Sequence, residues 1–92
     1  MKSIMQSGED RCILCGCRTG LETHHVLGGT ANRRLSERYG LTVRLCQRHH
    51  TGKDGAQYNK ELNHNLKRLA QIAFEARYSH DEWMQIFKKN YL

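Results

Sequence analysis

Proline is absent from this 92-residue sequence, and internal repeats, low-complexity tracts and linker-like segments are absent as well. Nothing along the chain marks a boundary between domains, so we expect residues 1–92 to form a single domain. A chain of this length buries only a modest share of its surface, and a bound metal ion is the expected supplement to a thin hydrophobic core.

Long apolar runs are also missing. No stretch approaches the roughly 20 residues that span a bilayer, and residues 1–10 hold no apolar run of the kind found in a secretory signal peptide. We therefore expect a cytoplasmic protein that does not associate with membranes. In a compartment that keeps thiols reduced, the four cysteines favour a metal site over disulfides.

Acidic residues are scarce relative to basic ones. Fifteen Lys and Arg stand against nine Asp and Glu, which gives a formal net charge of +6 and a pI near 9.4. A polyanion such as DNA is the natural partner of such a chain, although a basic surface can also serve solubility alone.

Cysteines and histidines form an ordered series along the chain. Two cysteines spaced C-x2-C precede a cysteine and a histidine spaced C-x2-H, and together they complete a Cys3His set for tetrahedral zinc. These ligands are Cys12, Cys15, Cys46 and His49. A structural zinc site has no need of the remaining His24, His25 and His50. We interpret these three as a second site that zinc holds in place and that is suited to acid–base or metal chemistry.

Local patterns predict an α+β order of elements. Residues 11–20 are typical of a zinc knuckle, in which Gly16 permits the tight turn around the thiolates. Short strands are predicted at 23–27 and 41–45, paired as a hairpin-like ribbon and separated by a short helix at 32–39.

The C-terminal part is predicted to be helical. After a polar loop, apolar side chains recur at spacings of three and four and indicate the buried face of a long helix. They are Tyr58, Leu62, Leu66, Leu69, Ala73 and Ala76. Ser79 and Glu82 have the spacing of a capping box, which predicts a last helix that buries Trp83, Ile86 and Phe87.

The order C-x2-C-G, H-H-V, L-C-x2-H-H resembles the HNH endonucleases. The stretch ETHHVLGGTANRRLSERYGLTVRLCQRHH, together with YNKELN and KNYL, is more similar still to small HNH-type proteins of bacteriophages and prophages. The core of the resemblance covers residues 12–60. It implies a zinc knuckle and ββα-metal fold over residues 11–56, C-terminal helices over 57–92, and a phage-encoded endonuclease acting in the host cytoplasm.

The resemblance also implies roles for individual residues. His24 and His50 would bind a catalytic divalent ion, Mg²⁺, Mn²⁺ or Ni²⁺, separate from the structural Zn²⁺. His25 would be the general base that activates water, and Asp54 or Gln57 would complete the ligands of the catalytic ion. The residues implied to contact DNA phosphates are Arg33, Arg34, Arg44, Arg48 and Lys53.

Two positions depart from the family pattern. Leu41 stands where a middle asparagine usually falls, which leaves Asn32 as the substitute catalytic residue unless Asn32 caps the short helix instead. Gln57 stands where phage-type relatives carry a histidine, and glutamine is a poor metal ligand beside imidazole.

Two functions follow from these observations. The first is a metal-dependent HNH-type DNA endonuclease, for which a homodimer would be the simplest way to cut both strands. The second is a catalytically impaired zinc module that binds DNA or a protein partner.

Overall fold

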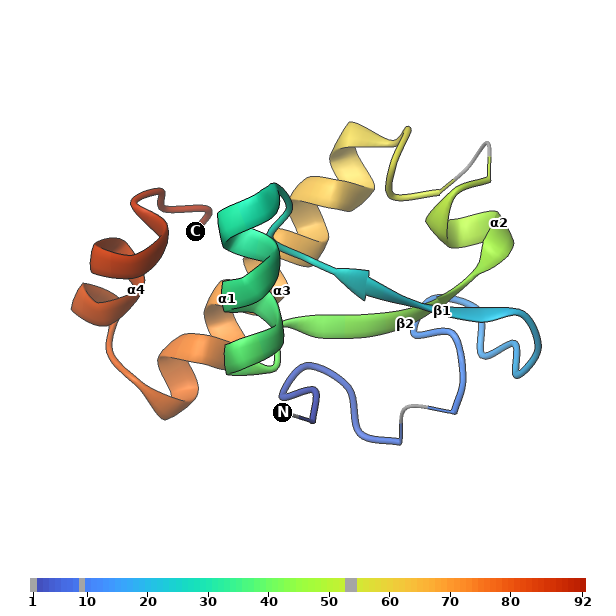
Figure 1. The fold of residues 1–92 in the computed structure, drawn as a ribbon, viewed down its shortest axis with the longest axis horizontal. Coiled ribbons are helices and arrows are strands. Elements are labelled where there is room, and N and C mark those ends of the chain that lie inside the picture. Colours follow the sequence, from blue (N-terminus) through green and yellow to red (C-terminus); the bar gives the residue numbers. More distant parts are fainter. Residues whose placement is uncertain (1, 9, 53–54) are drawn as a thin grey trace.

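The computed structural model describes residues 2–8, 10–52 and 55–92, which form an α+β fold of helices around a two-stranded antiparallel sheet (Figure 1). In chain order the elements are β1 (Leu21–His25), α1 (Thr30–Tyr39), β2 (Thr42–Cys46), α2 (Gln47–His50), α3 (Lys60–Arg77) and α4 (His80–Phe87). In Figure 1, α2 lies at one end of the molecule and α4 at the other. Within the described ranges no helix is long and apolar enough to cross a membrane.

The two strands pair in a register that sets Leu21 opposite Cys46. β1 runs two residues earlier than predicted, and β2 one residue later. The hydroxyl of buried Ser36 explains why β1 ends at His25. It accepts the N–H of Leu27 at 3.1 Å and donates to the carbonyl oxygen of Leu27 at 3.0 Å, so a side chain takes the place of a strand partner there.

Helix α1 ends at Gly40, which adopts the left-handed conformation with φ 72°. The carbonyl of Gly40 accepts the N–H of Ile4 at 2.9 Å, so the N-terminal segment packs against this turn. A Cβ atom at Gly40 would collide with the carbonyl oxygen of Lys2. Glycine is required here both by the backbone conformation and by the close approach of another segment.

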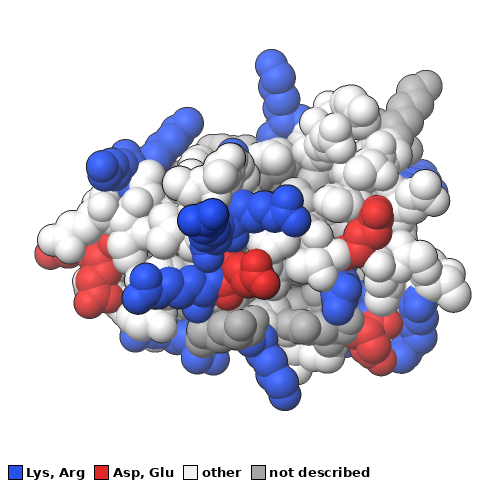
Figure 2. All heavy atoms as spheres, viewed as in Figure 1, with Lys and Arg blue, Asp and Glu red and all other residues white. Residues whose placement is uncertain are grey.

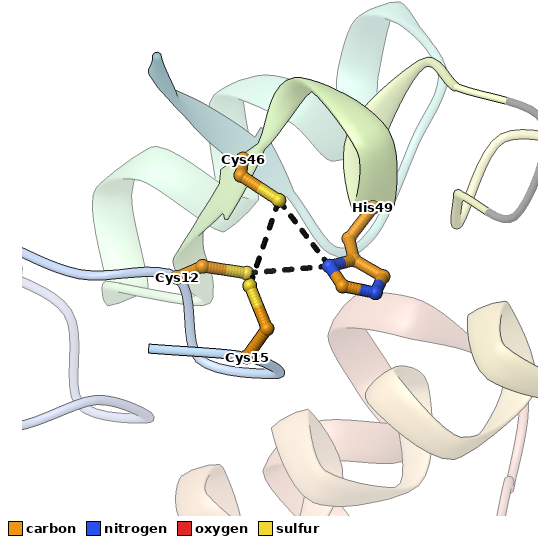
Figure 3. Close-up of side chains that lie close together, drawn as sticks. All are labelled: Cys12, Cys15, Cys46 and His49. Carbon is orange, nitrogen blue, oxygen red and sulfur yellow. Dashed lines mark hydrogen bonds between the residues drawn. The ribbon is translucent and has the colours of Figure 1, made fainter. Parts of the chain in front are cut away.

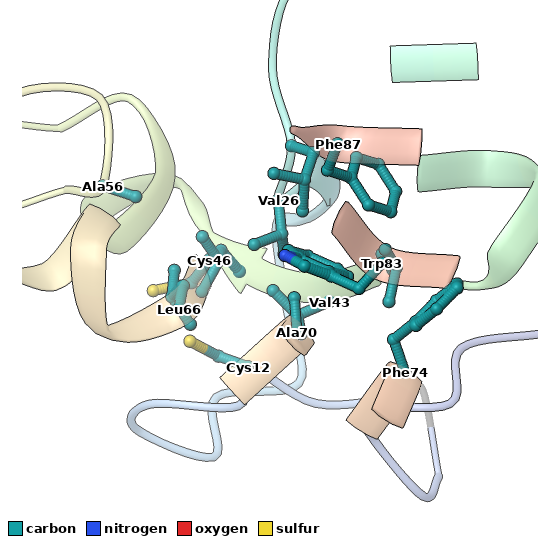
Figure 4. Close-up of a cluster of buried hydrophobic side chains, with 13 residues drawn as sticks. Cys12, Val26, Val43, Cys46, Ala56, Leu66, Ala70, Phe74, Trp83 and Phe87 are labelled. Carbon is teal, nitrogen blue, oxygen red and sulfur yellow. The ribbon is translucent and has the colours of Figure 1, made fainter. Parts of the chain in front are cut away.

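One cluster of buried side chains joins the sheet to the helices (Figure 4). The ring of Phe74 on α3 is central to it, with its centroid 5.4 Å from those of both Tyr39 and Trp83. The cluster also includes Val26, Leu27, Val43, Leu45, Leu66, Ala70 and Phe87. The C-terminal helices are therefore packed on the same core that supports β2.

The buried face of α3 is rotated from the predicted one. Leu66 is buried as expected, but Tyr58 and Leu69 are 66% and 50% exposed, so their prediction as core residues was wrong. Ala70 and Phe74 are buried instead, at successive spacings of four from Leu66. The predicted apolar stripe continued from Leu66 to Leu69, a spacing of three, whereas the buried face continues from Leu66 to Ala70, a spacing of four.

Helix α4 begins with the predicted capping box. Ser79 Oγ accepts the N–H of Glu82 at 3.1 Å, and the Glu82 carboxylate accepts the N–H of Ser79 at 3.4 Å. Trp83 and Phe87 are buried, and Ile86 is half-buried.

Candidate metal centre and histidine cleft

The four predicted zinc ligands converge at one point (Figure 3). Cys12 and Cys15 come from the loop before β1, whereas Cys46 ends β2 and His49 lies on α2. Their ligand atoms all lie within 4.8 Å of one another. Because β1 pairs with β2 in the observed register, the loop that enters β1 is brought beside the end of β2.

The separations suit a tetrahedral ion. The sulfurs of Cys15 and Cys46 are 3.7 Å apart, and His49 Nδ1 lies 3.2 Å from Cys46 Sγ and 3.8 Å from Cys12 Sγ. Bonds of about 2.3 Å to sulfur and about 2.0 Å to nitrogen put tetrahedral ligand atoms roughly 3.5–3.8 Å apart. The cluster can therefore hold a metal ion such as zinc.

Backbone groups around the knuckle favour thiolate at Cys12. Burial raises the pKa of this thiol, but amide hydrogen bonds from Cys46, Cys15 and Leu14 outweigh burial and lower the pKa to about 6. Gly16, with φ 77°, makes the predicted tight turn, and its N–H donates to the carbonyl of Cys12 at 2.8 Å. Thiolate is the form that binds metal.

The pKa of the Cys15 thiol is shifted in the opposite direction, upward. A backbone hydrogen bond from Cys17 lowers its pKa, but desolvation and the sulfurs of Cys12 and Cys46 raise it by more. Three sulfurs crowded at one point disfavour a second thiolate, and a bound cation would relieve that repulsion.

A cleft of about 640 Å³ lies next to the metal centre, between β1, α1 and α2. The structure brings together in this cleft the three histidines that were interpreted as a second site: His24, His25 and His50. Its opposite wall is formed by α1 and by the glycines that precede it.

His24 and His50 face each other across the cleft. Their ring centroids are 5.2 Å apart, with an angle of 70° between the rings. The Nε2 atom of His24 is buried, and no other buried side-chain nitrogen or oxygen in the described part of the chain lacks a hydrogen-bond partner. Leaving such an atom unpaired costs about 1–3 kcal/mol, which calls for an explanation such as a bound ion.

The environment of His24 also suits a metal ligand. Burial lowers its pKa to about 4, and the charges of His50, His25 and Lys67 contribute in the same direction. The imidazole is therefore neutral near pH 7, as metal coordination requires.

Glu22 positions the ring of His50. The Nδ1 atom of His50 lies 3.1 Å from Glu22 Oε1, so Nδ1–H donates to this carboxylate and Nε2 is the ring nitrogen left for another partner. A carboxylate on the second nitrogen is the usual partner of a metal-binding histidine. Sequence reasoning missed Glu22. The alternation of side chains in a strand could have indicated it, because Glu22 and His24 share a face of β1.

His25 lies in the same cleft, with 17% of its side chain exposed. Its Nε2 is 3.7 Å from Glu37 Oε2 on α1. Glu37 was also missed, and only its place on the predicted short helix could have indicated it.

The basic residues predicted to contact phosphates divide into two groups. Arg33 and Arg34 line the cleft from α1. Arg44 lies on β2 and Arg48 on α2, outside the lining of the cleft. Lys53 lies outside the described residues.

Two other predicted site residues are not gathered at the histidines. Asn32 was expected either to serve at the site or to cap the short helix. It is the third residue of α1, so it does not cap the helix, and it does not line the cleft. Gln57 is exposed and lines a different hollow. Leu41, at the position of the missing asparagine, is completely buried. Asp54 lies outside the described residues.

No family model matches this chain, and no curated protein and no solved structure shows significant similarity to it. The resemblance to HNH endonucleases therefore rests on the motif residues of the sequence.

Proposed function

We propose that this protein is a metal-dependent HNH-type endonuclease that hydrolyses DNA phosphodiester bonds. The observation that carries the proposal is the buried Nε2 of His24, which has no hydrogen-bond partner among the described residues and lies beside the ring of His50. The order β1, β2, α2 beside a Cys3His cluster supports a ββα-metal core.

His24 and His50 would hold the catalytic ion. Such an ion stabilises the charge that develops on the attacked phosphate and on the leaving oxygen. Both ligands come from elements anchored by the zinc cluster, because His24 lies on β1 and His50 directly follows the zinc ligand His49.

His25 is the proposed general base. It follows His24 on β1 and lines the same cleft, so it can take a proton from a water molecule that attacks phosphorus. Glu37 Oε2, 3.7 Å from His25 Nε2, would then stabilise the imidazolium that forms.

Helix α1 is proposed to bind the phosphate backbone of DNA. Arg33 and Arg34 line the cleft, and Figure 2 shows basic side chains gathered over α1. The helix starts after Gly29, which makes no side-chain cap and whose missing Cβ would meet open space. Its first amides are therefore accessible to a phosphate oxygen.

A plasmid-nicking assay tests the proposal. The zinc-loaded protein should nick supercoiled DNA in Mg²⁺, Mn²⁺ or Ni²⁺, and His25→Ala should lower the rate by roughly 10²-fold or more. His80→Ala is the matched control, because His80 is exposed on α4 and pairs with Glu75 at 3.0 Å, away from the cleft. Unchanged nicking in His25→Ala, with zinc content and circular dichroism preserved, would overturn the proposed role of His25.

The second candidate is a noncatalytic zinc module that binds DNA or a protein partner. Leu41 and Gln57 favour it, because the first is buried where the family carries asparagine and the second lines a different hollow from the histidines. No nicking in any of the three metals, combined with zinc as the only bound ion, would select this function over the nuclease.

A further inference from the structure

We propose that a second hollow, between α3 and the C-terminal segment, binds a backbone phosphate of a nucleic-acid strand. This lysine hollow, of about 250 Å³, is lined by Ala56, Gln57, Lys60, Asn63, His64, Lys67, Lys89 and Tyr91. The site goes beyond the proposed nuclease centre, and binding at it does not require that the protein cleave DNA.

Among the described residues, nothing offsets the positive charge in the lysine hollow. Lys60 and Lys67 come from α3, and Lys89 comes from the segment after α4. Within residues 2–8, 10–52 and 55–92, no carboxylate lines the hollow and no ion pair includes any of the three lysines. Three ammonium groups brought together from two segments form a site for an anion.

The volume of the lysine hollow limits the size of the ligand that it can enclose. Pockets that enclose a whole small-molecule ligand measure about 300–1,000 Å³, and this hollow is smaller. It suits a single anionic group on a longer ligand. The amide of Asn63 and the imidazole of His64 add hydrogen-bonding groups to the lysines, a combination typical of phosphate contacts.

The C-terminal wall of the hollow is held by buried side chains. Gln71 is completely buried, and its Oε1 accepts the N–H of Tyr91 at 2.7 Å while its Nε2 donates to Asn90 Oδ1 at 2.8 Å. Trp83 Nε1 donates to the carbonyl of Lys89 at 2.8 Å. Chain ends are usually poorly ordered unless they are tied down, so these bonds give Lys89 and Tyr91 fixed positions.

The ring of Tyr91 lies near the ammonium groups of two of the three lysines. The Nζ atoms of Lys67 and Lys89 lie 5.6 and 5.4 Å from the centroid of its ring, within cation–π range. The ring of His64 is 5.9 Å away from the same centroid. The aromatic ring thus holds two ammonium groups at the hollow without neutralising them.

The lysine hollow adjoins the histidine cleft. The N–H of Gln57, which lines the hollow, donates to the carbonyl of His50 at 3.3 Å and so joins the hollow to α2. A strand seated at the cleft could therefore continue into the hollow, and a nucleic acid accounts for the site better than an isolated small anion.

A binding assay tests this proposal independently of cleavage. Fluorescence anisotropy would measure the affinity of zinc-loaded protein for labelled single-stranded and duplex oligonucleotides, without a catalytic ion, over a range of salt concentrations. Lys67→Gln with Lys89→Gln should weaken binding about tenfold and reduce the slope of log affinity against log salt by about 1.

Arg68→Gln with Lys88→Gln is the matched control. Each substitution lies one position along the chain from its counterpart, both side chains are exposed, neither lines the hollow, and the loss of charge is the same. This pair should lose less than about threefold in affinity.

Three results would overturn the proposal. Equal losses in the two pairs would mean that only net charge matters, and no loss in either would mean that the hollow makes no contact. Binding of inorganic phosphate as tightly as an oligonucleotide, lost in the Lys67→Gln, Lys89→Gln protein, would make the hollow a small-anion site. Absence of nicking by the wild-type protein would count against the nuclease alone and would leave this test intact.

Discussion

Removal of zinc should unfold this protein. The cluster ties the loop that carries Cys12 and Cys15, which has no helix or strand of its own, to the end of β2 and to α2. For 92 residues, a typical stability of about 0.05–0.15 kcal/mol per residue gives about 5–14 kcal/mol. Structural zinc contributes roughly 10–16 kcal/mol of apparent binding free energy. Because the second quantity is as large as the first, the zinc-free chain should retain little or no stability.

Far-UV circular dichroism and metal analysis provide the assay. The purified protein should contain one zinc per chain, and a chelator should abolish both the helical signal and the cooperative melting transition, which added zinc should restore. A reductant is needed throughout, because the sulfurs of Cys15 and Cys46 lie 3.7 Å apart and could form a disulfide once the ion leaves.

The fourth cysteine supplies a matched control. Cys17 lies outside the cluster, with its Sγ 3.5 Å from the hydroxyl and the carbonyl oxygen of Thr19. Cys15→Ser should lower zinc content and melting temperature together, whereas Cys17→Ser should preserve both. A native dichroism spectrum and a cooperative melt in reduced, zinc-free protein would refute the reasoning.

Two further predictions concern stability. Gly40→Ala should lower the free energy of unfolding by more than about 2 kcal/mol, or the melting temperature by roughly 10 °C, because it adds a backbone clash to the left-handed conformation. Gly20→Ala is the control, because Gly20 has φ 63° but no atom lies within 4 Å of the added Cβ, so only the conformational cost should appear. Equal losses of stability in the two variants would contradict this account. The lowered pKa of His24, about 4, means that the unfolded chain binds more protons between pH 4 and about 6.5. Stability should therefore fall with acidification. Measured by urea unfolding, the wild type should lose about 2 kcal/mol more of its free energy of unfolding than His24→Gln between pH 7 and 5. Identical pH profiles of the two proteins would show that His24 is not buried as described.

The zinc ligands could be predicted because their chemistry is local. Each half of the set occupies a short segment with fixed spacing, and any fold that pairs the segments completes the site. The capping box of α4 was equally local, since Ser79 and Glu82 satisfy each other within one turn. The order of the two strands and of α1, α3 and α4 followed from short patterns of the same kind, whereas these patterns did not predict α2.

The predictions from sequence failed where contacts between residues far apart in the sequence determine the structure. Gln71 is buried on α3 because it hydrogen-bonds the backbone of Tyr91, 20 residues later, and no periodicity of apolar residues signals a buried amide. Glu22 orients His50 from 28 residues away. The end of β1 depends on Ser36, which lies on the next element, α1, nine residues after Leu27, and no sequence motif marks it.

The four-residue helix α2 connects the two candidate sites. Successive residues on a helix point about 100° apart, so His49 reaches the sulfurs of the metal centre while His50 turns toward His24. Any displacement of α2 that removed His49 from the cluster would also remove His50 from the cleft. A zinc ion in the cluster would therefore fix the distance between His50 and His24 without contacting either of them, while Glu22 on β1 hydrogen-bonds the His50 ring. Under the proposed function, one ion would supply both stability and the placement of a ligand of the catalytic ion.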